Sequence, residues 1–250
     1  LATGLEDVRE FFTTFYTPAN ATLVVYGDIE ENQTKELIQK YFGEIKGAPK
    51  PEPPAIVQPY QLTDTVREVY TDKVFLPKLY FAWPSVVAFT REDIALALAS
   101  DFLTSSKNSR LHKKFVFTDE SLQNISFSNY TGKYHGMNLL TATVKPGFDP
   151  LEMEKEIIAE LNNAIRSEVT TEEMNRIKYN YKVQAIYNLQ SVNAIASRMN
   201  EYNFYTGDPD HMSAILDTIA SITAEEMLSV VQKYTTENYA RLLIAPGGNK

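Results

Sequence analysis

The chain has 250 residues, with 24 Lys plus Arg against 32 Asp plus Glu, which gives a formal net charge of −8 at pH 7. This charge excludes a general electrostatic attraction to nucleic acid or to an anionic membrane surface. It has no cysteine, which excludes disulfide scaffolds, thiolate zinc sites, iron–sulfur clusters and cysteine nucleophiles. Apolar residues make up 44%, enough for a sizeable core, but no stretch has the ~20 apolar residues that cross a bilayer.

The first predicted element is a helix that follows Thr3. Thr3-x-x-Glu6 is a capping box, and an apolar face then recurs at helical spacing: Leu5, Val8, Phe11, Phe12 and Phe15. Residues 21–26 (Ala-Thr-Leu-Val-Val-Tyr) are a short β-branched apolar run closed by Gly27, which predicts a buried strand. A second helix is predicted over residues 31–42, closed by Gly43.

Residues 46–64 mark the clearest change in composition. They contain five prolines, a density that prevents helix and disfavours paired strand. We therefore expect an extended, semi-rigid linker over 46–64, between a leading piece (1–45) and a larger piece (65–250).

The larger piece is predicted to be α+β. Strand patterns stand at 66–71, 78–83, 122–130, 139–145 and 239–244, with a turn at 133–138 between the third and fourth. Helix starts are predicted at Thr90, at Asp149-Pro150, at Thr170 and at Thr223, and residues 157–234 are nearly all helical. Strands followed by helices favour a mostly antiparallel sheet with helices packed on one face.

The two ends of the chain match each other. Thr3-x-x-Glu6, a helix, Tyr16-Thr17-x-x-Asn20 and an apolar run are repeated as Thr223-x-x-Glu226, a helix, Tyr234-Thr235-x-x-Asn238 and an apolar run. Self-similarity in a fixed order indicates a duplicated unit, although helix–turn–strand units are common enough to coincide by chance. If the unit is duplicated, 1–45 is the end of a first unit and 65–250 a complete second one. We then expect a fragment or processed product, which also fits the absence of an initiating Met.

No motif for catalysis or metal binding is found. His112, His135 and His211 are isolated, with neither H-E-x-x-H nor H-x-x-E-H, and His112 is interpreted as part of a solvated basic helix face. No serine-nucleophile or phosphate-binding motif occurs. Carboxylate pairs at 30–31, 172–173 and 225–226 lie in first helical turns, where the helix dipole explains them. The predicted catalytic, cofactor-binding and metal-ligating residues are therefore none.

Residues 16–28 carry a specific resemblance. They read Tyr-Thr-Pro-Ala-Asn-Ala-Thr-Leu-Val-Val-Tyr-Gly-Asp and lie between two predicted helices. This stretch resembles the pitrilysin family of zinc metallopeptidases, which includes insulin-degrading enzyme and mitochondrial processing peptidase. Residues 76–83, Ser109-Arg110-Leu111 and 170–176 are similar to further elements of that family, so that the resemblance covers almost the whole chain.

The resemblance assigns no catalytic residue here. It implies that the family's zinc ligands and general base lie upstream of the segment that matches this chain. An ungapped alignment from Ser109-Arg110-Leu111 places Val116 and Gln123 where the family's second half carries an Arg and a Tyr. The lack of this Arg and Tyr fits the second subdomain of a catalytic N-terminal half. It also fits a wholly non-catalytic homologue. Arg110 is predicted to be structural, because a guanidinium can satisfy several carbonyls or a carboxylate at once.

Three functions remain open. The first is a chamber-wall subdomain of a zinc-dependent peptidase that degrades or processes peptides, with zinc in the parent protein and none in this chain. The second is a non-catalytic structural subunit, or an inactive homologue of a processing peptidase, and the third is an unrelated α+β binding module. The acidic balance weakly favours basic or neutral peptides.

The resemblance also implies partners. These are the missing zinc-binding subdomain, the second half of the parent, and peptide substrate, whereas nucleic acid and membrane are not expected. Residues 1–45 would lack their own sheet, so self-association through them is expected, with folding back on 65–250 or partial disorder as alternatives. The expected location is the bacterial periplasm or cell envelope.

Overall fold

The computed structural model describes residues 4–55 and 61–247, so the Thr3 cap and Pro59 of the linker lie outside the described residues. The chain forms two compact units. One consists of Leu1–Ile56 with Ala185–His211, and the other of Val57–Gln184 with Met212–Lys250. In the described part of the predicted linker, residues 46–55 and 61–64 form neither helix nor strand.

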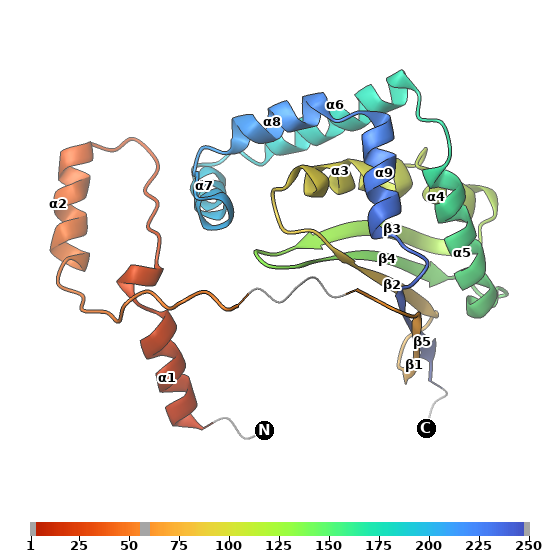
Figure 1. The fold of residues 1–250 in the computed structure, drawn as a ribbon, viewed down its shortest axis with the longest axis horizontal. Coiled ribbons are helices and arrows are strands. Elements are labelled where there is room, and N and C mark those ends of the chain that lie inside the picture. Colours follow the sequence, from red (N-terminus) through yellow and green to blue (C-terminus); the bar gives the residue numbers. More distant parts are fainter. Residues whose placement is uncertain (1–3, 56–60, 248–250) are drawn as a thin grey trace. The chain divides into compact units, whose positions relative to one another are not determined.

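The second unit is built on one five-stranded sheet (Figure 1). Its strands are β1 (Val66–Asp72), β2 (Lys78–Ser85), β3 (Leu122–Thr131), β4 (Gly136–Val144) and β5 (Ala240–Pro246), in the order β1-β5-β2-β4-β3. Every neighbouring pair is antiparallel except β1 and β5, which run parallel. The predicted α+β class and mostly antiparallel sheet are confirmed.

Helices cover one face of this sheet (Figure 1). They are α3 (Arg91–Ser100), the π-helical turn η2 (Asp101–Ser105), α4 (Arg110–His112), the π-helical turn η3 (Lys113–Thr118), α5 (Pro150–Ile165), α6 (Thr171–Tyr187), α8 (Met212–Ser221) and α9 (Ala224–Tyr234). The predicted starts are confirmed, since the hydroxyl of Thr90, Thr170 or Thr223 accepts a hydrogen bond from the amide three residues on, at 3.1–3.2 Å.

The core lies between the sheet and these helices. Along β2, Leu79, Phe81 and Trp83 are buried beneath the helices, because alternate side chains of a strand point to one face. The indole Nε1 of Trp83 donates a hydrogen bond to the carbonyl of Thr236 at 3.0 Å. The interleaved Tyr80 is half-buried on the opposite face, which the helices leave open.

The first unit contains α1 (Leu5–Phe15), the 3-10 turn η1 (Pro18–Asn20), α2 (Glu31–Phe42) and α7 (Val192–Thr206). α1 begins after Gly4, whose amide donates to the Asp7 carboxylate at 2.8 Å. No residue of α1 or α2 is buried, although both helices form as predicted. Their apolar faces are therefore exposed to solvent within this chain.

The predicted buried strand at 21–26 is wrong. These residues form no strand, and Leu23, Val25 and Tyr26 are 56%, 43% and 45% exposed. A strand needs neighbours to satisfy its backbone N–H and C=O groups, and every strand of the sheet comes from the second unit. The matching run at the other end of the chain does form a strand, β5, because β1 and β2 flank it.

The predicted turn at 133–138 is also too long. β4 already begins at Gly136, because residues 136–138 pair with both β2 and β3. Pairing on both sides supplies the hydrogen bonds that a turn would leave to water.

Within the described ranges, none of the helices combines the length and the apolar character needed to span a membrane.

Candidate functional site

His112 and His135 belong to the second unit, and His211 belongs to the first. His135 is exposed in the β3–β4 turn, and Nδ1 of His211 lies 3.9 Å from the Asp208 carboxylate before α8. Among residues 4–55 and 61–247, no group of three or more His, Asp or Glu side chains could hold a metal ion. Zinc sites in proteins need three or four converging donors, so the residues present do not fit the zinc that the resemblance implies for the parent.

The interpretation of His112 as part of a solvated face is wrong. Its ring is half-buried beside Phe117, with the two ring centroids 5.6 Å apart. Its Nδ1 atom is shut off from solvent and has no hydrogen-bond partner in the structure. Helix α4 has only three residues before the chain continues into η3, and this packing encloses one edge of the ring.

We expect the isolated chain to bind no zinc tightly and to show no peptidase activity. Among the described residues, the side chains that could bind zinc do not converge on one point. No general base can therefore act on a metal-bound water there. Metal analysis of a dialysed sample and a fluorogenic peptide assay would check this. Stoichiometric zinc held by three or more side chains would contradict it, whereas an ion bound at a single His would not.

The carboxylate pairs serve helix ends and ion pairs. Glu30 is the N-cap of α2 and accepts hydrogen bonds from two backbone amides of its first turn. Glu226 binds Arg91 through two hydrogen bonds of 2.5 and 2.7 Å, and this ion pair lowers the pKa of Glu226. Glu173 is held by Arg110. None of these arrangements pairs two carboxylates for acid–base chemistry.

Arg110 joins three elements of the second unit. Its guanidinium makes a two-pronged contact with the Glu173 carboxylate, at 2.8 and 3.0 Å, and also donates to the carbonyl of Glu168 at 3.0 Å. The same group lies 4.9 Å from the ring centroid of Phe102. These contacts support the structural role predicted for Arg110. Val116 and Gln123 occupy the two positions that align with the family's Arg and Tyr. Val116 is half-buried in η3, and Gln123 is exposed on β3.

We expect Arg110→Lys to lower the free energy of unfolding by about 1–2 kcal/mol. An ammonium keeps the charge but cannot reproduce the planar fork that holds Glu173 and the Glu168 carbonyl together. Urea unfolding would measure the change, with Arg166→Lys at an exposed position as the matched control. Equal urea midpoints for Arg110→Lys and wild type would contradict the structural role. The contradiction would be stronger if the same substitution abolished the activity of a larger parent protein.

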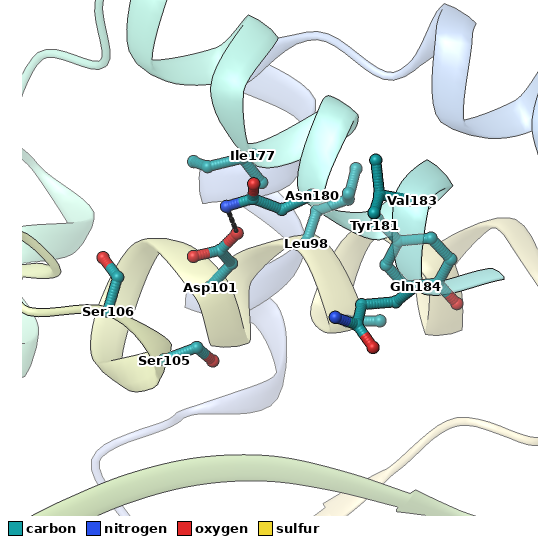
Figure 2. Close-up of a pocket in the computed structure, with 10 residues that line it drawn as sticks. Leu98, Asp101, Ser105, Ser106, Ile177, Asn180, Tyr181, Val183 and Gln184 are labelled. Carbon is teal, nitrogen blue, oxygen red and sulfur yellow. Dashed lines mark hydrogen bonds between the residues drawn. The ribbon is translucent and has the colours of Figure 1, made fainter. Parts of the chain in front are cut away.

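A pocket of about 420 Å³ lies between α6 and the segment formed by α3 and η2 (Figure 2). Asp101 and Asn180 face each other across it, and the Asn180 amide donates to the carboxylate at 3.0 Å. Ser105 and Ser106 lie at one end, where their hydroxyls contact the Ser100 carbonyl and the Ser109 hydroxyl. No histidine or lysine of the described residues lines this pocket, and both serine hydroxyls are hydrogen-bonded to a carbonyl or another hydroxyl, not to a group that activates a nucleophile.

A second hollow, of about 410 Å³, lies on the open face of the sheet. Ala82 and Ala240, which are directly paired between β2 and β5, both line it. Its lining is almost entirely apolar: Val66, Tyr70, Tyr80, Leu139 and Leu242 border it, together with Glu68 and Arg241. This surface could be recognised from the sequence. The strand positions that point away from the helices are mostly apolar, whereas a sheet face in contact with water is usually polar.

A buried ionic network ties α5 to the sheet. The Glu154 carboxylate accepts hydrogen bonds from Arg67 at 2.7 Å, from Arg241 at 2.8 Å and from the Tyr239 hydroxyl at 3.1 Å. Burial alone would raise the pKa of Glu154, but the two guanidinium groups and Tyr239 outweigh it and lower the pKa. Sequence reasoning missed this network, since its members lie far apart in the chain and share no local pattern.

Comparison with known proteins identifies related sequences. Residues 4–181 match the family described as "Peptidase M16 inactive domain". "Zinc protease PqqE" of Helicobacter pylori is 27% identical over 239 residues, which span 92% of this chain and 52% of that protein. "Uncharacterized zinc protease YmxG" of Bacillus subtilis is 24% identical over 251 residues, which span 98% of this chain and 58% of that protein. The chain therefore spans just over half the length of these curated relatives.

Solved structures share the fold. A protease from Helicobacter pylori matches with a TM-score of 0.86 at 22% identity, over 98% of this chain and 59% of that one. A peptidase M16 inactive domain from Pseudomonas fluorescens matches with a TM-score of 0.83 at 11% identity, over 99% and 58%. Such low identities establish the common fold alone, and the family assignment comes from the sequence match.

Proposed function

This chain belongs to the family of peptidase M16 inactive domains, and from that membership we propose that it forms a non-catalytic chamber wall of a zinc-dependent peptidase. The parent protein would degrade or process peptides. Zinc, its ligands and the general base would come from a part of the parent outside these 250 residues. The match with two bacterial zinc proteases, whose matched regions cover 52% and 58% of their length, supports this division of labour.

The observation that carries the proposal is the two-sided sheet. One face is covered by helices and holds the core, whereas the other is open and apolar around Ala82 and Ala240. An open apolar face is expected where a protein contacts a ligand or partner, because a face that only meets water gains nothing from apolar side chains. The described residues of this unit supply a surface and no catalytic group.

We further propose the same division into parts that the sequence predicts. Residues 1–45 would be the end of a first, zinc-binding type of subdomain, 46–64 the linker, and 65–250 the second subdomain. Support comes from the first unit, in which α1 and α2 bury none of their residues. In the parent, the missing body of the first subdomain would cover these helices and pair with residues 21–26.

We expect the isolated chain to self-associate through residues 1–45. Fourteen large apolar side chains there are at least 42% exposed, which amounts to an area on the order of 1,000 Å² per copy. The largest apolar patch of a monomer is usually about 300–600 Å², whereas two such surfaces match the area of a permanent interface. Light scattering over a dilution series would detect the dimer, and a strict monomer with 1–45 ordered against 65–250 would contradict it.

The parent protein tests the main proposal. The full-length product of the gene should bind zinc and cleave a quenched fluorogenic peptide. Deleting 65–250 should abolish cleavage while the zinc remains bound. A parent that binds zinc but cleaves nothing would favour the alternative, a structural subunit or an inactive homologue. A parent without zinc would overturn the zinc-peptidase proposal itself.

The bacterial cell envelope is the proposed location. Support comes from a structural relative that is described as a periplasmic protease of Escherichia coli, with a TM-score of 0.67 at 16% identity. Cell fractionation with an antibody to the chain would test this location, and a cytosolic signal would contradict it.

A further inference from the structure

We propose that the pocket between α6 and the α3–η2 segment binds a small primary amine, whose ammonium group lies between the Asp101 carboxylate and the hydroxyl oxygens of Ser105 and Ser106. A short alkyl chain on the amine would lie along the apolar part of the pocket (Figure 2). The volume of about 420 Å³ is within the ~300–1,000 Å³ range of small-molecule sites. Binding at this site requires neither zinc nor peptide cleavage.

The π-helical turn η2 brings the polar groups of the pocket together. α3 continues directly into η2, and Asp101, Ser105 and Ser106 all line the pocket. A π-turn closes hydrogen bonds between residues five apart, so residues four and five positions after Asp101 come to the same side of the chain. Such turns are rare and frequently occur at functional sites. The turn therefore places a carboxylate and two hydroxyls beside one cavity.

Both serine hydroxyls use their protons within the chain. Ser109 donates its hydroxyl proton to the Asp101 carbonyl at 2.6 Å, so Ser106 is the donor in the 2.9 Å contact between the two serine hydroxyls. Ser105 donates its proton to the Ser100 carbonyl at 3.0 Å. Because a hydroxyl has one donor and two acceptor lone pairs, the oxygens of Ser105 and Ser106 offer the pocket only lone pairs.

Asp101 adds a negative charge to these acceptors. It is the one charged side chain among the described residues that line the pocket, and 16% of it is exposed. The Asn180 amide donates to its Oδ2 atom at 3.0 Å. Its Oδ1 atom lies 4.0 Å from the guanidinium of Arg176, which is outside the lining, and this separation exceeds a hydrogen bond. Since a carboxylate accepts about four hydrogen bonds, Oδ1 has room for a further donor.

Acceptors beside a negative charge favour a cation that only donates. An ammonium group has three N–H donors and no acceptor, and its hydrogen bonds to a carboxylate are strengthened by charge. The rest of the lining is mainly aliphatic, with Leu98, Ile177 and Val183, and Tyr181 and Gln184 lie at the end away from the serines (Figure 2). An alkyl chain would cover these side chains, whereas a metal ion would leave the apolar part of the pocket unfilled.

NMR titrations of the full 250-residue chain, labelled with nitrogen-15, would test the proposal with n-pentylamine as the probe. Three comparison compounds separate the features of the ligand. n-Pentanol keeps the chain without the charge, pentyltrimethylammonium keeps the charge without N–H donors, and ammonium chloride supplies the cation without a chain.

Three variants test the residues of the site. Asp101→Asn removes the charge with little change of shape, and Ser105→Ala removes one acceptor at an exposed position. Asp217→Asn, at an exposed position of α8, is the matched control. Melting temperatures verify that each variant folds, and the decision rests on Ser105→Ala and on the comparison compounds if Asp101→Asn does not.

We expect n-pentylamine to shift the amide signals of η2 and of α6 around Asn180 in a saturable way. Asp101→Asn should weaken binding about tenfold or more, because the charge-assisted hydrogen bonds are lost. Ser105→Ala should weaken it about two- to fivefold, the size of one ordinary hydrogen bond, and Asp217→Asn should leave it unchanged. Each comparison compound should bind about tenfold more weakly or less tightly still.

The absence of saturable shifts in the pocket would overturn the proposal. Equal binding of n-pentanol, or unchanged binding to a folded Asp101→Asn variant, would show that the charge plays no part and would also overturn it. Equal binding of pentyltrimethylammonium would contradict the role of the acceptors, and equal binding of ammonium chloride would indicate a site for simple cations instead. None of these results bears on the parent assay, in which the loss of zinc would refute only the proposed function.

Discussion

Replacing Glu154 by glutamine is expected to lower the free energy of unfolding by roughly 3–5 kcal/mol, the range found when one partner of a buried ion pair is removed. The side chains of Glu154 and Arg241 are 6% and 5% exposed, so the Arg241 charge would remain buried without its counter-ion. Arg67 is half-exposed and can turn toward water, and it should contribute less to the loss.

Urea unfolding followed by the fluorescence of Trp83, the single tryptophan, would measure this effect. Glu152→Gln on the same helix is the control, because Glu152 is exposed and pairs only with Lys155 at the surface. It should change stability by no more than about 0.5 kcal/mol. A Glu154→Gln variant as stable as this control would show that the network does not stabilise the fold.

The same network predicts how stability depends on pH. The pKa of Glu154 is lowered in the folded state from an ordinary value of 4.5. Its contribution to stability is therefore fully present above that value and is lost as the pH falls through the lower folded pKa. Unfolding measured between pH 7 and pH 3 should show a shallower acid loss for Glu154→Gln than for wild type. Equal slopes for the two proteins would contradict this.

Trp83→Ala is expected to cost about 3–5 kcal/mol, the usual range for removing a buried aromatic side chain. Trp83 is almost fully buried between Phe81 and Tyr239, with ring centroids 6.4 and 5.7 Å away. Its removal leaves a cavity in the core and also takes the hydrogen-bond donor from the Thr236 carbonyl. Both effects lower stability.

Far-UV circular dichroism in urea would measure this change, since the variant has no tryptophan to report by fluorescence. Phe75→Ala is the matched control, because Phe75 is large, aromatic and fully exposed. It should shift stability by no more than about 0.5 kcal/mol. If the two alanine variants unfolded at the same urea concentration, Trp83 would not belong to the folding core.

The family resemblance and most helices and strands of the second unit could be predicted from the sequence. Their signals are local: a Thr hydroxyl that caps the next turn, a Pro at a first helical position, and alternating apolar residues along a strand. The starts at Thr90 and Thr223 are examples, since each cap bond spans only three residues. The resemblance at 16–28 is equally local and led to the right family.

Tertiary structure alone decided which apolar runs become strands and which surfaces can act as sites. Residues 21–26 and β5 follow matching helices and connectors, yet only β5 has strands beside it to satisfy its backbone. The hollow exists because strand register places Ala82 beside Ala240, and the network exists because α5 carries Glu154 onto Arg67 and Arg241. Local sequence determines capping and alternation through neighbouring backbone groups, whereas pairing, burial and charge neutralisation depend on segments that meet only in the folded chain.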